Sequence, residues 1–230
     1  MKPYIFLSGN YLNNTIDDNA TVVDLRTIDT AAPYTGQANF TDLYGNGVAR
    51  LVDTIILQDT NIANMTVEVK GPGGVFMTLL TVTDNTESTV IIKAPSPIST
   101  QAIRITVPEA GNPATVRAKI GAYGFVCNLL ALTDSNYKIA ANQGDYRVVS
   151  GAYIHWADYK KWVGKVKMQN LPKAQFDALT AQADTGTMTV VPYTDLEATA
   201  IYECGVNREY TYEVDRKTEL FTLELELNEL

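Results

Sequence analysis

The sequence predicts a mainly β protein, in which an N-terminal β-sandwich jelly roll is followed by a small α+β domain with one helix packed on an antiparallel sheet. Up to about residue 130, short β-favouring runs alternate with turn-forming clusters roughly every ten residues, as in sandwiches and jelly rolls. A helical period appears only after residue 170. Hydrophobic residues make up 46% of the 230 positions and charged residues 19%, a composition that suits folded cores.

The strands of the first half show two kinds of pattern. Residues 65–69 alternate apolar and polar side chains, which is typical of a half-buried strand, and the Gly-Pro-Gly-Gly sequence at 71–74 then predicts a turn. Further strands are predicted at 76–82 and 103–107. The run at 52–57 is more continuously apolar, so we expect a central strand that is covered on both faces.

A polar link at 132–136 separates two predicted domains, residues 1–131 and 132–230. The link follows a strand rich in small and apolar residues, where few contacts are expected to cross between domains. After it, strands are predicted at 146–149 and 162–168.

Residues 171–184 have the period and the flanking residues of a helix. Pro172 stands near the first turn and Gly186 just past the last one, positions that favour the start and the end of a helix. Phe176 and Leu179 lie on one face of it. We therefore expect this helix to pack on a sheet.

The chain closes with a predicted hairpin, formed by residues 210–214 and 220–227 around a charged turn. Leucines in the second strand alternate with polar residues that include Glu224 and Glu226. The acidic face of this strand either keeps it soluble or matches a basic partner.

The residue combinations that catalysis needs are missing from the sequence. His155 is the single histidine, so base catalysis or metal ligation lacks a second imidazole. No serine stands in a Gly-X-Ser-X-Gly elbow, and no glycine-rich loop has the ending that cradles phosphate. Cys127 and Cys204 are far apart in strand-like runs, which favours small buried side chains over a disulfide or metal site. We expect no enzymatic activity, no cofactor and no metal site.

The net charge of −8 disfavours anionic partners. The 26 Asp and Glu outnumber the 18 Lys and Arg, so nucleic acid is not an expected partner. The first apolar run is too short for a signal peptide, and no later run reaches membrane-spanning length. Neither cleavable export nor membrane insertion is therefore expected.

One basic concentration stands out in this acidic chain, close to two aromatic residues. It suits a solvated face, or contact with DNA, an acidic glycan or an acidic face of another subunit. Of these possible partners, another subunit requires the fewest special features of the sequence. The basic residues are Lys160, Lys161, Lys165, Lys167 and Lys173, and the predicted assembly interface comprises Tyr159, Lys161, Trp162, Glu224 and Glu226.

Residues 1 to about 130 resemble the discoidin-like, galactose-binding-type jelly roll. The resemblance is carried by Leu51-Val52-Asp53-Thr54-Ile55-Ile56-Leu57, by Thr60-Asn61-Ile62 leading into 65–69, and by 102–107 before Ile120-Gly121-Ala122-Tyr123-Gly124. In such folds, loops at one end of the sandwich commonly bind carbohydrate or a surface ligand.

The same resemblance implies an alternative function, a carbohydrate-binding module that recognises a glycan of the host surface. Its candidate loops are residues 26–39 and 84–87. A sugar would stack on exposed aromatic side chains such as Tyr34 or Tyr44.

The second half resembles small domains of phage tail proteins. The order is a strand at 162–168, a helix with Phe176, then Val190-Val191-Pro192-Tyr193, a strand at 201–204 and an acidic final strand. The resemblance implies a non-enzymatic structural virion protein, assembled in the host cytoplasm into the tail or the tail-proximal region. Its implied partners are other virion proteins and copies of itself.

Overall fold

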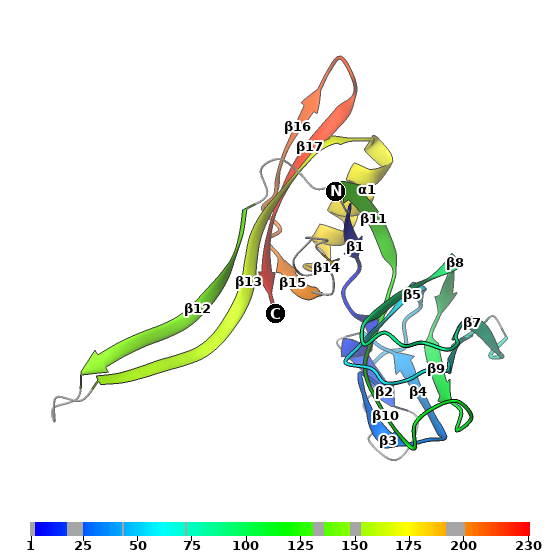
Figure 1. Ribbon diagram of the computed structural model, residues 1–230. Coiled ribbons are helices and arrows are strands. Elements are labelled where there is room, and N and C mark those ends of the chain that lie inside the picture. The colour runs from blue at the N-terminus through cyan, green and yellow to red at the C-terminus, as the bar shows by residue number, and fades with distance from the viewer. Residues whose placement is uncertain are drawn as a thin grey trace. The chain divides into compact units, whose positions relative to one another are not determined.

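The computed structural model describes residues 3–17, 25–42, 44–71, 73–130, 136–147, 153–191 and 201–230 (Figure 1). The chain forms two compact units. One is Asn10–Phe125, here called the sandwich unit, and the other combines Met1–Gly9 with Val126–Leu230 and is called the sheet unit. The expected boundary at 131/132 lies a few residues after the observed one, and the first nine residues belong with the C-terminal part of the chain.

The sandwich unit contains a five-stranded and a four-stranded antiparallel sheet. A 3-10 turn, η1 (Tyr11–Asn14), precedes them. The larger sheet has the order β2 (Thr15–Asp17), β4 (Tyr34–Phe40), β9 (Ala102–Val107), β6 (Met65–Lys70), β7 (Phe76–Val82). The smaller sheet has the order β3 (Thr27–Ala31), β10 (Thr115–Tyr123), β5 (Arg50–Gln58), β8 (Val90–Thr100).

The core of the sandwich unit follows the alternation in its strands. Met65, Val67 and Val69 of β6 are buried, whereas the residues between them are half-buried, as the period-two pattern predicts. Residues 52–57 of β5 are all buried, which confirms a central strand covered on both faces. Each fully buried aliphatic side chain stabilises the fold by about 1.5–3 kcal/mol relative to an exposed one.

The sheet unit is built on one antiparallel sheet, and the helix packs on it. Among the described residues the strand order is β11 (Phe125–Leu130), β1 (Pro3–Leu7), β14 (Thr187–Val191), β15 (Tyr202–Val206), β17 (Leu220–Glu229), β13 (Tyr153–Leu171), β12 (Asn136–Arg147). β16 (Thr211–Asp215) also pairs with β17, as the predicted hairpin requires. The predicted jelly roll and α+β domain are thus confirmed.

Helix α1 (Lys173–Asp184) ends at the predicted residue but begins two residues later than the predicted 171, because Leu171 is the last residue of β13 (Tyr153–Leu171). Pro172 has φ −58°, which fits the residue before the first turn, and Gly186 has φ +85°, a left-handed conformation that favours glycine. Leu179 and Ala183 are fully buried and belong to a core with strand residues such as Leu225. The helix packs mainly against β14 and β17.

Strands β12 and β13 are longer than expected. The predicted strand at 162–168 is the middle of a strand that runs from Tyr153 to Leu171. Its second half pairs with β17, and its first half pairs with β12. We call residues 136–147 and 153–162 the arm; Figure 1 shows it as a ribbon that extends away from the remaining strands of the sheet unit.

Candidate functional site

Tyr34 lies at the first position of β4 and is half-buried against the core of the sandwich unit. A Cβ at Gly36 would overlap the Tyr34 hydroxyl and crowd Leu25, so the tyrosine ring occupies the space that the glycine leaves free. The prediction of a loop at 26–39 is wrong, because β3 and β4 occupy almost all of this interval and only Ala32 and Pro33 join the two strands. Much of the Tyr34 ring is therefore engaged in packing.

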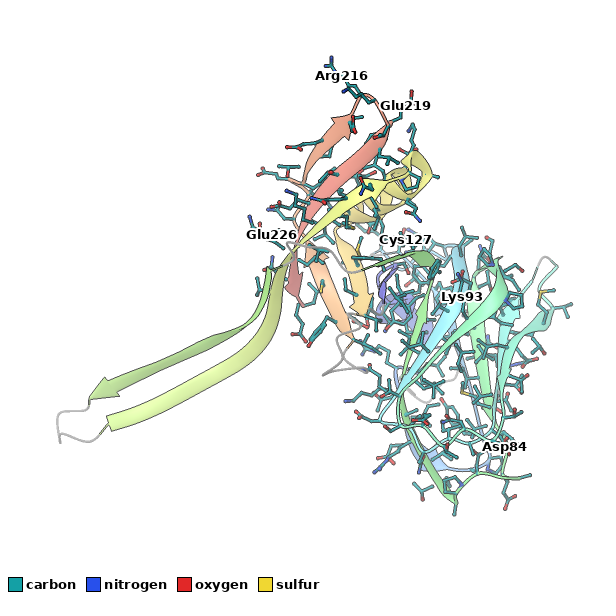
Figure 2. The ribbon with its side chains drawn as sticks, turned by 45° about the horizontal axis from the view of Figure 1, so that its top comes forward. Asp84, Lys93, Cys127, Arg216, Glu219 and Glu226 are labelled. Carbon is teal, nitrogen blue, oxygen red and sulfur yellow. The ribbon has the colours of Figure 1, made fainter. Side chains whose placement is uncertain are left out.

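Three loops meet at the end of the sandwich unit where β4 begins, and asparagine side chains connect them. Asn112 accepts hydrogen bonds from the backbone amides of Ala63 and Asn64, at 2.8 and 3.0 Å, and donates to the carbonyls of Asn64 and Pro108, at 2.9 and 2.8 Å. Asn85 donates to the carbonyls of Ile62 and Glu87. We call this the asparagine end; Figure 2 labels Asp84 there.

The predicted loop at 84–87 belongs to the asparagine end. Asp84 donates its backbone amide to the side chain of Asn64, and Glu87 donates its amide to Asn85. The loop is exposed but held by these bonds, so it presents Asp84, Thr86 and Glu87 to solvent on a fixed backbone.

The opposite end of the sandwich unit carries a pocket of about 370 Å³. We call it the glycine end. Its lining comes from three turns, after β4, after β6 and between β8 and β9, and consists of Ala49, Lys70, Gly71, Gly73, Gly74, Ser99, Thr100 and Gln101. Polar hydroxyl, amide and ammonium groups therefore surround a concave surface of the size that small ligands occupy.

Tyr44 stands in the loop that leads to this pocket and is 90% exposed. Asp42 fixes the loop: one carboxylate oxygen accepts from the amides of Tyr44 and Asn46 at 2.8 and 2.9 Å, and the other accepts from the Asn46 side chain at 3.0 Å. These bonds, led by the Asn46 side chain, lower the pKa of Asp42. Tyr34 and Tyr44 stand at opposite ends of β4, so the structure does not bring them together.

The acidic face of the last strand lies beside lysines of the same chain. In the register of β13 and β17, Lys165 pairs with Glu226 and Lys167 with Glu224. The ammonium of Lys165 lies 3.7 Å from a carboxylate oxygen of Glu224, and Asn207 donates to Glu226 at 3.4 Å. Figure 2 labels Glu226 on the sheet unit. Glu224 and Glu226, which were predicted to contact another subunit, therefore already have partners within this chain.

The predicted interface residues of the arm are described by backbone register alone. Tyr159 pairs with Asn142, Lys161 with Ala140 and Trp162 with Ile139. Because residues alternate between faces of a strand, Tyr159 and Lys161 share one face and Trp162 occupies the other. Sequence reasoning missed that these residues stand on a two-stranded ribbon, because the aromatic residues at 153–162 recur at every third position and give no period-two pattern.

Both cysteines lie in the core of the sheet unit, as expected of small buried side chains. Burial raises the pKa of each thiol to about 12, with Glu229 and Glu203 adding to the effect at Cys204. Both are free thiols. Within the described ranges, no three His, Cys, Asp or Glu side chains are grouped as metal ligands would be, and no helix is long and apolar enough to cross a membrane.

The sequence matches no protein-family model and no curated protein. Among solved structures, a family 32 carbohydrate-binding module of NanJ from C. perfringens, in complex with galactose, has 16% identity and a TM-score of 0.38, and the match covers 51% of this chain and 98% of that one. A family 32 module of EndoD from Streptococcus pneumoniae has 15% identity and a TM-score of 0.36, over 46% and 78%. A chitosan-binding module from Paenibacillus sp. IK-5 has 15% identity and a TM-score of 0.34, and the match covers 54% of this chain and 95% of that one. At these values the likeness says nothing of the ligand.

Proposed function

We propose that the protein is a non-enzymatic structural subunit of a tailed-phage particle, which assembles through its arm with copies of itself and with other virion proteins. The observation that carries the proposal is the arm. β12 is an edge strand whose only neighbour in the described sheet is β13, and the first half of β13 has no second neighbour there.

A two-stranded ribbon of this kind is marginally stable in water by itself. The arm nevertheless carries Tyr137, Ile139, Tyr146, Ile154 and Trp156, residues with large apolar surfaces. Association with another protein surface would bury these groups and satisfy the free edge of β12. An arm that becomes stable only when covered suits a protein whose task is assembly.

The placement in a phage tail rests on the order of elements in the second half of the chain. In the described residues a long strand, one helix, three short strands and an acidic final strand follow each other, an order that resembles phage minor structural proteins. Repeated weak contacts around a symmetry axis would then add up to a stable particle. On this proposal the protein assembles in the host cytoplasm and is found in the virion tail.

The test compares the full chain with a variant in which a short Gly-Ser turn replaces residues 136–162. Sedimentation velocity should show concentration-dependent oligomers for the full chain and a monomer for the variant, with the thermal midpoint of the sheet-unit core unchanged. Antibodies against the protein should also label the tails of purified particles. A full chain that stays monomeric at concentrations on the order of 100 μM, far above ordinary affinities for assembly, would refute the proposal.

The glycine end supports a second candidate function, the recognition of a surface glycan. The pocket and the 90% exposed ring of Tyr44 provide polar groups and a stacking surface in one region of the sandwich unit. On a glycan array, Tyr44→Ala should abolish binding and Tyr44→Phe should retain most of it. Tyr212→Ala, which removes an exposed tyrosine of the sheet unit, is the matched control. Equal binding by the wild type and Tyr44→Ala would contradict this function.

A further inference from the structure

The pocket at the glycine end collects three polar side chains that form no hydrogen bond or ion pair within the described part of the chain. They are the ammonium of Lys70, the hydroxyl of Ser99 and the amide of Gln101. Thr100 differs from these three residues, because it is buried and its hydroxyl lies 3.0 and 2.8 Å from the carbonyl oxygens of Lys70 and Ala102, which accept its proton. Thr100 therefore holds the backbone of the pocket, and its neighbours present polar groups to a ligand.

The side chain of Lys70 lies along the glycine turn that follows β6. A Cβ added at Gly74 would lie 3.7 Å from Cε of Lys70, and the ammonium nitrogen is bonded to this carbon. A Cβ added at Gly73 would have no heavy atom within 4 Å, so there is open space beside the turn. Both glycines have positive φ, +83° and +88°, a conformation that favours glycine and keeps side chains out of this space. A ligand can thus approach the cation and the backbone closely.

The carboxylates nearest in sequence and in the adjoining loop are already engaged by other groups. Glu68 shares a face of β6 with Lys70, but it accepts two hydrogen bonds from Arg104, at 2.7 and 2.9 Å. Both carboxylate oxygens of Asp42 accept hydrogen bonds within their own loop. Among the described residues that line the pocket, Lys70 carries a charge and none is Asp or Glu. The pocket therefore has a positive centre without a counter-charge.

We propose that this pocket binds the carboxylate of an acidic sugar, such as a uronic acid unit of a surface glycan, an inference that rests on the glycan recognition proposed above. Lys70 forms the ion pair, and Ser99 and Gln101 donate hydrogen bonds to the sugar. Hydrogen bonds between an ammonium and a carboxylate are stronger than those between neutral groups. A neutral sugar would displace water from the ammonium without matching its charge.

The net charge of −8 does not prevent such a ligand from binding. At physiological ionic strength, exposed charges further away than about 8 Å are largely screened. The local cation therefore determines the sign of the ligand that the pocket prefers. The exposed ring of Tyr44, in the adjoining loop, remains available to stack on a sugar ring.

The first experiment applies the full chain to an array on which each acidic glycan stands beside its methyl ester. Esterification removes the negative charge and leaves the rest of the sugar unchanged. The array also carries neutral and sulfated glycans. We expect binding to glycans with a free carboxylate and loss of at least nine-tenths of the signal on their esters, since a hydrogen bond to a charged group is worth roughly a tenfold to hundredfold change in affinity.

The second experiment measures the affinity of variants for a bound acidic glycan by titration calorimetry. Lys70→Met keeps the length of the side chain and removes its charge, so it should raise the dissociation constant roughly 10- to 100-fold. Gln101→Glu keeps the shape of the side chain and places a carboxylate beside the ammonium, so it should abolish binding. The matched control is Lys119→Met, because this exposed lysine of the sandwich unit is already paired with Asp59, at 2.7 Å. It should bind like the wild type.

The outcomes separate this inference from glycan recognition itself. If the wild type binds neutral or only sulfated glycans, or binds methyl esters as tightly as free acids, the acidic-sugar inference is wrong although the protein still recognises glycans. Unchanged affinity of Lys70→Met overturns it as well. If no glycan is bound at all, glycan recognition fails. Thermal unfolding should be unchanged in Lys70→Met and Gln101→Glu, because neither side chain has a hydrogen-bond partner in the described residues.

Discussion

Removal of the Asn112 side chain should destabilise the sandwich unit more than any other change at an exposed or half-exposed polar residue. The amide makes four hydrogen bonds of 2.8–3.0 Å and joins the loop before β6 to the loop before β10. One hydrogen bond contributes about 0.5–1.5 kcal/mol net, and the freed backbone groups are partly solvated. Asn112→Ala should therefore lower the free energy of unfolding by about 2–3 kcal/mol.

Differential scanning calorimetry of the full chain measures this effect directly. For a unit of this size, the loss corresponds to a fall of roughly 8–15 °C in the thermal midpoint of the sandwich unit. The transition of the sheet unit provides an internal reference. Asn228→Ala, an exposed asparagine of β17, is the control and should leave the sandwich transition in place. A fall of less than about 3 °C for Asn112→Ala would show that the loops are held by other contacts.

Three further predictions concern other parts of the chain. Glu68 accepts two hydrogen bonds from Arg104, at 2.7 and 2.9 Å, and the bond to Arg104 lowers the pKa of Glu68. The ion pair therefore stabilises the fold at pH values above the usual carboxyl pKa, and this stabilisation is lost as the pH falls through the lowered pKa of Glu68. Glu68→Gln should make the free energy of unfolding, measured by fluorescence, depend less on pH on the acid side. An unchanged pH dependence would contradict a stabilising role of the pair. Leu179→Ala should cost the sheet unit about 2–5 kcal/mol in urea unfolding, since the side chain is fully buried, whereas exposed Ala181→Gly should cost about 1 kcal/mol. Cys127 and Cys204, with thiol pKa values of about 12, should react with a thiol reagent at pH 8 only after denaturation; rapid reaction of the native protein would contradict their burial.

Local patterns predicted the elements whose structure depends on neighbouring residues. β6 and β7 begin at the expected residues, and α1 ends before Gly186, because alternation and backbone preference act within a few positions. The loop at 26–39 was predicted from the resemblance to galactose-binding-type jelly rolls and not from a local pattern. The residues form β3 and β4 instead, and Gly36 leaves room there for the Tyr34 ring.

Long-range pairing was beyond the reach of such patterns. Residues 5–7 pair with 189–191, and no local signal connects two segments so far apart. The length of β13 was missed because its two halves have different neighbours, β17 for one and β12 for the other. Of the two tyrosines predicted for a ligand, Tyr44 is exposed and Tyr34 packs against the core, a difference that depends on tertiary contacts.

The pairing of β1 with β14 makes the whole sandwich unit an insertion within the sheet unit. During synthesis, the first strand has to wait for its partner until the inserted unit has been made, so the sandwich unit can fold before the sheet that surrounds it in sequence. Because the insertion begins and ends within the span between β1 and β11, a different module at the same place would leave the strand order of the sheet intact. The sandwich unit is in this sense an exchangeable cassette, whose sequence can vary without changing the pairing of the strands in the sheet unit.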